Sequence, residues 1–322
     1  MPSRQVPDFD GPDAPELLMA ATEQSSIPNS QTSAGVFDSA QIRCTDAWNG
    51  RSSGRSWAIY CGSAIDVLKQ MPPEAVNCTI TSPPYFWLRD YGVNGQIGLE
   101  DTVEEYVAAL VSTMREVRRL LAPDGLSFLN IGDTFYSGKG ESQGQDGKSK
   151  KRRFGLRAVD KSGGLGIGLR RKSLIGIPWR VAVELVSDGW VLRSSVIWHR
   201  KNRLPEFVRD RPARSYEYVF ILAKSRRYYF DKQALVSRKI EEDLWTIPAQ
   251  PRDTGGLDTA PFPDELVERC LAIGCPKRGV VLDPFVGSGT TVRVSLSSGR
   301  SAVGIDLNRE FCVYAANSLR AL

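Results

Sequence analysis

One stretch near the C-terminus restricts the fold of this 322-residue chain more than any other. Residues 280–282 are apolar, as in a short buried strand, and residues 290–298 have the composition of a helix that ends before Gly299. A glycine-rich turn lies between them, and residues 301–305 form a second apolar run. Strand, turn, helix and strand in this order predict a β-α-β unit, whose two strands lie parallel in one sheet.

The same alternation of elements extends over most of the chain. Apolar runs of strand length, bounded by turn residues, occur at residues 57–61, 76–81, 126–131, 191–198 and 216–223. Helices are expected at residues 64–70, 102–121, 178–187 and 265–273. Together with the β-α-β unit, this pattern predicts an α/β fold with a mostly parallel, seven-stranded sheet and helices on both faces.

The remaining regions differ in composition. Residues 1–55 are rich in Ser, Pro, Gln and Asp and show no periodicity, so we expect a flexible N-terminal tail, followed by one domain over residues 56–322. Residues 137–172 contain few apolar residues and many Gly, Ser, Lys and Arg. This composition indicates a long basic insertion within the domain.

Composition also disfavours several classes of protein. No apolar run approaches the roughly 20 residues that span a bilayer, and the polar N-terminus does not resemble a signal peptide, so we expect an intracellular protein without membrane contact. The six cysteines form no CxxC pair, which indicates reduced thiols. Because His199 is the only histidine, we expect neither a metal site nor a Ser-His-Asp triad.

Positive charge is concentrated in the middle of the chain. The net charge is +5, but residues 136–239 carry 25 Lys and Arg against 9 Asp and Glu. This distribution favours a polyanion-binding surface, with a solvated basic face as the alternative. The expected phosphate contacts are Lys148, Lys150, Lys151, Arg152 and Arg153 in the insertion, and Arg200, Lys201, Arg203, Arg209, Arg211 and Arg214 beyond it. A nuclear-localisation role of the first cluster is a weaker alternative.

The glycine-rich turn has the features of a ligand-binding loop. Its sequence is Asp283-Pro284-Phe285-Val286-Gly287-Ser288-Gly289-Thr290-Thr291. Glycines let the backbone approach a ligand, and the helix that follows offers free N–H groups. Asp306 ends the next strand, where a carboxylate can accept both ribose hydroxyls of an adenosine cofactor. The missing Gly-Lys-Ser/Thr excludes a P-loop, and a purely structural turn is the alternative.

A second loop follows the strand predicted at residues 76–81. In Ser82-Pro83-Pro84-Tyr85, two prolines end the strand pairing and stiffen the loop. A hydroxyl, a backbone carbonyl and an aromatic ring are thereby fixed in space. Taken alone, these four residues favour an ordinary rigid turn with a packed tyrosine over a functional site.

Together, the two loops resemble the amino-methyltransferases of DNA, whose catalytic motif is [DNS]-P-P-[YF] and whose cofactor motif is close to D-x-F-x-G-x-G. The Ser-initiated form is characteristic of N4-cytosine enzymes, and the order, with the catalytic motif first, resembles the permuted β class. The resemblance covers about residues 57–322. It includes residues 126–135, residues 215–220 and a Pro-Phe-Pro element at residues 261–263, which in this family helps to hold the methionine end of the cofactor.

The resemblance implies a Rossmann-like methyltransferase fold with S-adenosyl-L-methionine as cofactor. It assigns catalysis to Ser82, Pro83, Pro84 and Tyr85, and cofactor binding to Asp283, Pro284, Phe285, Gly287, Ser288, Gly289, Thr290, Thr291, Asp306, Phe262 and Pro263. A short target-recognition region is expected at about residues 224–259. Gly62-Ser63 departs from the Gly-Asp that family members often have, so no cofactor contact is assigned there.

The implied reaction is direct in-line methylation of N4 of a flipped cytosine in double-stranded DNA. An N6-adenine methyltransferase is the nearest alternative, followed by a non-catalytic DNA-binding protein on the same scaffold and a nucleotide-dependent oxidoreductase. A C5-cytosine enzyme is disfavoured because the chain has no Pro-Cys pair. Further partners considered are a second copy of the chain, a cognate restriction enzyme and, for a bacterial-type enzyme acquired by a eukaryote such as a bdelloid rotifer, chromatin in the nucleus.

Overall fold

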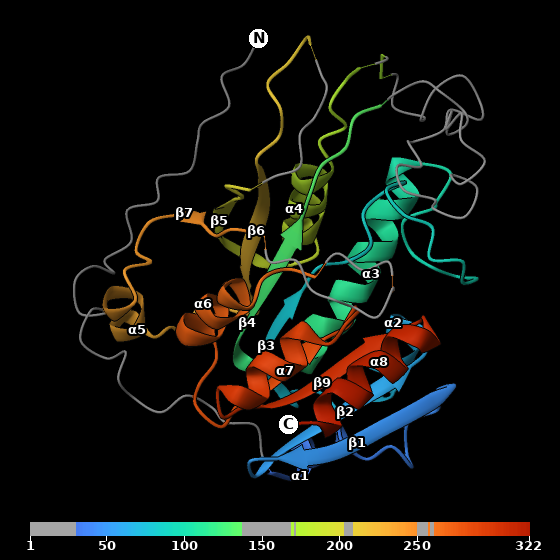
Figure 1. The fold of residues 1–322 in the computed structure, drawn as a ribbon, viewed down its shortest axis with the longest axis vertical. Helices are drawn as coiled ribbons and strands as arrows, with labels where there is room; N and C mark the ends of the chain where they lie inside the picture. The colour runs from blue at the N-terminus through green and yellow to red at the C-terminus, as the bar shows by residue number, and fades with distance from the viewer. Residues whose placement is uncertain (1–29, 137–168, 171, 203–208, 250–256, 258–260) are drawn as a thin grey trace, which may run out of the picture.

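The computed structural model describes residues 30–136, 169–170, 172–202, 209–249, 257 and 261–322. These residues build one nine-stranded sheet in the order β1-β2-β9-β8-β3-β4-β6-β5-β7, with helices on both faces (Figure 1). Within the described parts of the chain, no helix is long and apolar enough to cross a membrane.

The centre of the sheet consists of five parallel strands. In spatial order they are β2 (Arg55–Cys61), β9 (Ser301–Asp306), β8 (Val280–Asp283), β3 (Val76–Thr81) and β4 (Leu121–Ile131). Most of their residues are buried, as expected for parallel strands that helices cover on both faces. The carboxyl ends of all five strands lie at one edge of the sheet, which is where open α/β folds bind their ligands.

An antiparallel hairpin extends the sheet beyond β4. β6 (Tyr216–Ala223) pairs antiparallel with β4, and β5 (Val191–His199) pairs antiparallel with β6. The end of β5 and the start of β6 therefore lie at the same edge as the carboxyl ends of the central strands. The seven strands expected from the sequence are present, and β1 (Asp46–Ser52) and β7 (Leu244–Thr246) add one strand at each side.

Two groups of helices cover the sheet. One face carries α2 (Ala64–Gln70), α3 (Val103–Leu120) and α4 (Ile177–Ser187). The other carries α6 (Asp264–Gly274), α7 (Thr290–Ser297) and α8 (Arg309–Arg320). Each face thereby has its own cluster of buried apolar side chains.

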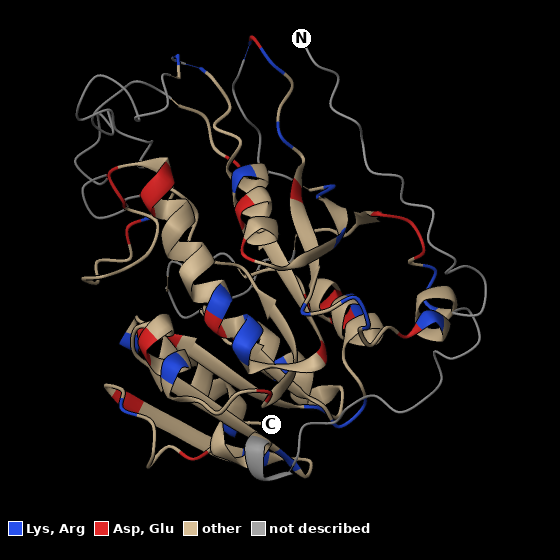
Figure 2. Cartoon of the chain, turned by 180° about the vertical axis from the view of Figure 1, so that it is seen from behind, with Lys and Arg blue, Asp and Glu red and all other residues tan. Residues whose placement is uncertain are grey.

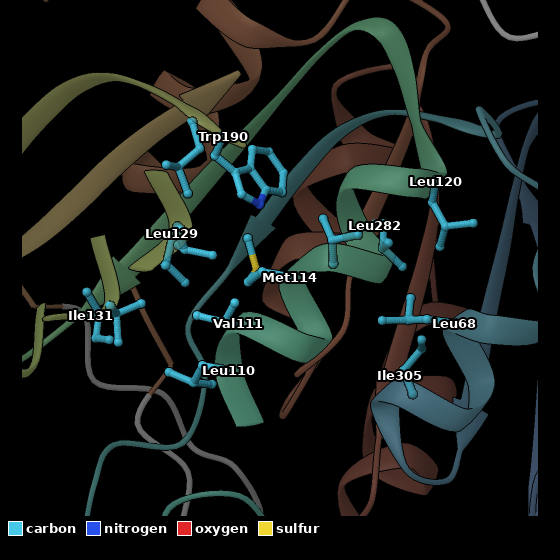
Figure 3. Close-up of a cluster of buried hydrophobic side chains, with 14 of the residues drawn as sticks. Leu68, Leu110, Val111, Met114, Leu120, Leu129, Ile131, Trp190, Leu282 and Ile305 are labelled. Atoms are coloured by element: carbon cyan, nitrogen blue, oxygen red, sulfur yellow. The ribbon is translucent and has the colours of Figure 1, made fainter. Parts of the chain in front are cut away.

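The long helix α3 begins at a capping box and buries one face. The Thr102 side chain accepts from the backbone N–H of Glu105, and the Glu105 carboxylate accepts from the backbone N–H of Thr102, each at 3.1 Å. In Figure 3, Met114 of α3 points toward Leu129 of β4 and Trp190. The predicted apolar stripe is thus the side of α3 that packs on the sheet.

On the opposite face, α6 lies so close to β4 that its last residue has no room for a side chain. A Cβ atom at Gly274 would lie 2.4 Å from the ring of Phe128. Glycine at this position therefore sets the distance between α6 and the sheet.

The predicted N-terminal tail is wrong from residue 30 onward. Residues Ser30–Gly35 form the short helix α1, and β1 pairs antiparallel with β2 in continuous register from Asp46↔Cys61 to Ser52↔Arg55. Ser53 and Gly54 connect the two strands with φ of 48° and 75°, the geometry of a tight hairpin turn. A search for apolar runs does not detect β1. This strand contains few apolar residues, and its burial alternates between intermediate and exposed.

Three further elements were not expected from the sequence. α5 (Lys232–Ser237) and β7 lie in the region 224–259, and α8 follows Asp306. Most of the proposed insertion, namely residues 137–168 and 171, lies outside the described residues.

Candidate active site

A cavity of about 760 Å³ opens at the carboxyl edge of the sheet. Its wall contains Ser82 and Tyr85 from one loop, and Asp283 and Gly287 from the other, although the two loops are some 200 residues apart in sequence. The cavity is within the size range of about 300–1,000 Å³ that small-molecule sites occupy. The two predicted loops thus form one site.

The loop after β3 is held rigidly from behind. The Tyr106 hydroxyl, on α3, donates to the carbonyl of Pro84 at 2.9 Å, and the backbone N–H of Leu88 donates to the carbonyl of Tyr85 at 3.2 Å. Gly98 has φ of 109° and lies against the same loop, since a Cβ there would be 3.1 Å from the carbonyl oxygen of Tyr85. These contacts fix the direction in which Ser82 and Pro83 face the cavity.

The hydroxyl of Tyr85 is oriented by a carboxylate. It donates to Glu217 Oε2 at 2.6 Å, and the Asn130 amide donates to the same oxygen at 3.2 Å. Burial and the neighbouring Glu217 raise the pKa of Tyr85 well above its usual value, so the phenol stays protonated. Its ring packs on Gly132, where a Cβ would be 2.7 Å from Tyr85 Cε2.

Arg200 and Ser82 extend this hydrogen-bond network. Arg200 pairs with the second carboxylate oxygen of Glu217 at 3.0 Å. The Ser82 hydroxyl donates to the oxygen of Tyr85 over a long 3.4 Å contact. A Ser82 hydroxyl that donates to Tyr85 keeps its lone pairs free to accept hydrogen bonds from a ligand.

Asp283 accepts hydrogen bonds from three different parts of the fold. Its carboxylate accepts from the hydroxyl of Thr81 at the end of β3 (2.7 Å), from that of Thr291 in α7 (2.6 Å) and from the backbone N–H of Phe285 (3.1 Å). Burial raises the pKa of Asp283 to about 6, against the lowering effect of these donors.

Asp306 has a different set of contacts. Its carboxylate accepts from the backbone N–H groups of Gly287 and Asn308, each at 2.9 Å, and burial raises its pKa to about 6. A carboxylate has about four acceptor positions, so it can also accept ribose hydroxyls. Gly287, with φ of 50°, has open space where a side chain would be. The loop therefore fits an adenosine-containing cofactor.

Not every predicted cofactor residue reaches the cavity. The wall includes Pro284, Phe285, Ser288, Thr290, Thr291 and Phe262, as the resemblance implies. Gly289 and Pro263 are instead the N-caps of α7 and α6 and do not line the cavity. Gly289 has φ of 85°, and a Cβ there would be 3.0 Å from Ala315, so glycine lets α7 begin close to α8. Ser63, which was not assigned, does line the cavity.

The basic residues lie at different places on this edge. Arg200 lines the cavity, whereas Lys201 and Arg209 are exposed. The guanidinium groups of Arg211 and Arg214 lie over the ring of Phe135, at 3.9 and 5.4 Å from its centre. Figure 2 shows Lys and Arg on the loops around this edge of the sheet. The remaining predicted phosphate contacts, Lys148, Lys150, Lys151, Arg152, Arg153 and Arg203, lie outside the described residues.

Sequence reasoning missed two residues of the site. Asn130 and Glu217 were included only in strand motifs, without a function of their own. The available signal was their position, since each is a polar residue in an apolar strand next to the carboxyl edge. A buried polar residue in such a strand indicates a hydrogen-bond network.

The strand order, the glycine loop after β8 and the acid at the end of β9 define a Rossmann-like methyltransferase fold. Comparison with known proteins narrows the class. Residues 76–317 match the N6/N4 family of DNA methylases, and the chain belongs to this family. It is a DNA methyltransferase that acts on double-stranded DNA, with S-adenosyl-L-methionine as its cofactor.

Similar proteins include bacterial enzymes and solved structures. The chain is 41% identical to the type II methyltransferase M.SmaI of Serratia marcescens, over 82% of this chain and 91% of that one. It is 40% identical to M.Cfr9I of Citrobacter freundii, over 81% and 87%. The structure of the PvuII cytosine-N4-specific DNA methyltransferase has a TM-score of 0.62 at 20% identity, over 83% and 86%. A putative DNA modification methylase of Thermus thermophilus, solved with S-adenosyl-L-methionine, has a TM-score of 0.56 at 25% identity, over 82% and 93%.

Proposed function

We propose that this chain transfers the methyl group of S-adenosyl-L-methionine to N4 of cytosine in double-stranded DNA. The observation that carries the proposal is the position of Ser82, which lines the cavity shared with the glycine loop and has its hydroxyl 3.4 Å from that of Tyr85. The names of two groups of relatives support it. Those at about 40% identity are type II methyltransferases, and the PvuII enzyme, with the same fold, is cytosine-N4-specific.

Localising the lone pair of the target amine is the main chemical task, since that pair is delocalised into the cytosine ring. In our mechanism, the Ser82 hydroxyl and the Pro83 carbonyl accept the two N–H bonds of the amine. The nitrogen then moves toward tetrahedral geometry, and its lone pair points at the methyl group. Tyr85 packs against the flipped base. The methylated nitrogen is cationic and releases one N–H proton to solvent, so no strong base is needed. Positioning is the main catalytic contribution, and no covalent enzyme intermediate is required.

The cofactor supplies an electrophilic methyl group on a sulfonium cation. We propose that Asp306 accepts its ribose hydroxyls, that the residues around Gly287 let it approach the backbone, and that Phe262 contacts its methionine end. Asp283 and Asp306 both line the cavity that would hold this cation. Their charges favour binding of the sulfonium form over its neutral product.

The basic residues around the cavity are proposed to contact DNA phosphates. Lys201 and Arg209 are exposed, and Arg211 and Arg214 are held on Phe135 near the start of β6. This position lets them contact the backbone of a duplex whose base enters the cavity. By analogy with its type II relatives, we propose that the chain protects DNA from a cognate restriction enzyme. DNA methylated by the chain should then resist that endonuclease, and equal cleavage of methylated and unmethylated DNA would refute this role.

The decisive experiment separates the two amino-methyltransferase reactions. Unmethylated DNA is incubated with the protein and labelled S-adenosyl-L-methionine, and the nucleosides are analysed by mass spectrometry. N4-methylcytosine is expected, and sequencing then supplies the recognition site. N6-methyladenine alone would identify the adenine enzyme, and absence of cofactor binding would favour a non-catalytic DNA-binding protein.

Ser82→Ala tests the mechanism. The variant removes one of two acceptors for the target amine, so methyl transfer should fall by at least about 100-fold. Binding of S-adenosyl-L-methionine, measured by calorimetry, should stay within about threefold of the wild-type value, because Ser82 lies on the base side of the cavity. Full activity of Ser82→Ala would remove the serine from the mechanism.

A further inference from the structure

Arg200 occupies an unusual position for a phosphate contact. It follows the end of β5, and its side chain lines the same cavity as Ser82 and Tyr85. Its guanidinium lies 5.9 Å from the centre of the Trp198 ring and pairs with Glu217 at 3.0 Å. Glu217 in turn holds the hydroxyl of Tyr85 at 2.6 Å. Arg200 is thus paired with Glu217, the residue that also orients Tyr85 of the catalytic loop.

The guanidinium has donors left over. Its Nε is buried, and within the described residues it has no hydrogen-bond partner. The contact with an acidic group runs from Nη1 to Glu217. An arginine carries five N–H donors in a planar fork, and a buried donor without an acceptor is unfavourable. Because 27% of its side-chain surface remains exposed where it lines the cavity, Arg200 can donate through its Nη groups to a ligand that presents adjacent acceptors there.

A flipped cytosine presents such acceptors. Its base-pairing edge carries the N4 amine, the N3 lone pair and the O2 carbonyl in a row. When Ser82 and Pro83 hold the amine, N3 and O2 remain without donors. The edge of adenine carries an amine and N1, but a C–H group stands where cytosine has O2. The two bases therefore differ at the one position that needs a second donor.

We propose that Arg200 reads the base-pairing edge of the target, by donating to N3 and O2 of cytosine, and that it selects cytosine over adenine at this site. The inference deepens the proposed function and rests on it. Glu217 compensates the charge of Arg200 within the cavity and keeps its guanidinium in place. With adenine, one donor would face a C–H group instead of an acceptor, which opposes binding.

The test combines a protein change with a base change. The DNA carries the recognition site found for the wild-type enzyme. Its target is either cytosine or a 2-aminopyridine C-nucleoside, which keeps the amine and the ring nitrogen but lacks the carbonyl. kcat/KM is measured on both duplexes for the wild type and Arg200→Gln. The matched control is Arg193→Gln, which removes the same charge from the opposite end of β5, where Arg193 contacts Tyr228 rather than the cavity.

Loss of the carbonyl should reduce kcat/KM of the wild type and of Arg193→Gln by about 10- to 100-fold. On the cytosine duplex, kcat/KM of Arg200→Gln should be lower than that of the wild type by a similar factor. Changing cytosine to the analogue should then lower kcat/KM of this variant by less than about a further threefold. If instead the loss in kcat/KM from Arg200→Gln and the loss from removing the carbonyl multiply, Arg200 acts only by positioning Glu217 and Tyr85, and the proposal is overturned.

Two controls keep the outcomes separate. If Arg200→Gln does not fold, as judged by thermal unfolding and cofactor binding, Arg200→Lys carries the same comparison, because it keeps the charge beside Glu217 but lacks the planar fork. A wild-type enzyme that forms no N4-methylcytosine would refute the proposed function itself. N4-methylcytosine with multiplicative effects would refute only the role of Arg200.

Discussion

Asp283 and Asp306 are chemically identical side chains with separate tasks. Burial raises the pKa of both to about 6. Asp283 accepts from two threonine hydroxyls and a backbone N–H, and these donors belong to β3, α7 and the glycine loop. Asp306 accepts from two backbone N–H groups and retains acceptor positions toward the cavity. The first acid therefore joins elements, and the second is the better ligand for a ribose.

Cofactor affinity should depend on pH through these two acids. Because the pKa of Asp306 is raised to about 6, its carboxylate is ionised at pH 7.5 and protonated at pH 5. Binding that needs both carboxylates ionised weakens by up to about 100-fold per pH unit below about 6, tenfold for each acid, and is level above about 7. We expect calorimetry from pH 5 to 8 to show this loss.

Asp306→Asn provides the comparison, since it removes one titrating group and leaves Asp283. The variant should bind S-adenosyl-L-methionine more weakly at pH 7.5, and its affinity should fall less steeply below pH 6. Equal slopes in the two proteins would exclude Asp306 from the cofactor site.

At the scale of helices and strands, the sequence predicts those elements whose bounds are set by buried apolar residues. Strands β3 and β6 and helix α2 have the predicted bounds, because each is an apolar or periodic run between clear turn residues. β1 was missed because an edge strand with polar side chains on both faces lacks that pattern. Glu217 and Asn130 were missed for another reason: their pairing depends on the antiparallel register of β4 and β6, which no local pattern reveals.

The close approach of α6 to β4 leads to a prediction about stability. In Gly274→Ala the new methyl group would overlap the ring of Phe128, from which it would be 2.4 Å away. Overpacking of this kind lowers the free energy of unfolding by about 1–3 kcal/mol. Urea unfolding measures the change. Glu268→Ala, at an exposed position of the same helix, should stay within about 0.5 kcal/mol of the wild type. A Gly274→Ala variant as stable as that control would contradict the tight contact.

The whole molecule places its candidate chemistry and several of its predicted phosphate contacts at one edge of the sheet. The catalytic loop and the glycine loop both follow carboxyl ends of central strands, and Arg200 and Glu217 belong to the hairpin beside them. Arg209, Arg211 and Arg214 precede β6 at this same edge. The basic cluster Lys148, Lys150, Lys151, Arg152 and Arg153 lies in the segment that joins β4 to α4, and β4 ends at this edge. The topology therefore places the end of β4, from which this segment continues in sequence, at the edge where a flipped base would enter.

Salt dependence of DNA binding tests whether that cationic segment contacts phosphates. Replacing all five residues of the cluster by Gln should make the slope of log K against log salt concentration shallower by up to about 4.5, because each lost phosphate contact removes about 0.9 from the slope. The matched control replaces Arg226, Arg227, Lys232, Arg238 and Lys277, which are exposed, follow β6 or precede β8, and so lie at the opposite edge of the sheet. That control removes the same net charge and should leave the slope within about 1 of the wild type. Equal flattening in both variants would mean that net charge, rather than contact by this cluster, sets the affinity for DNA.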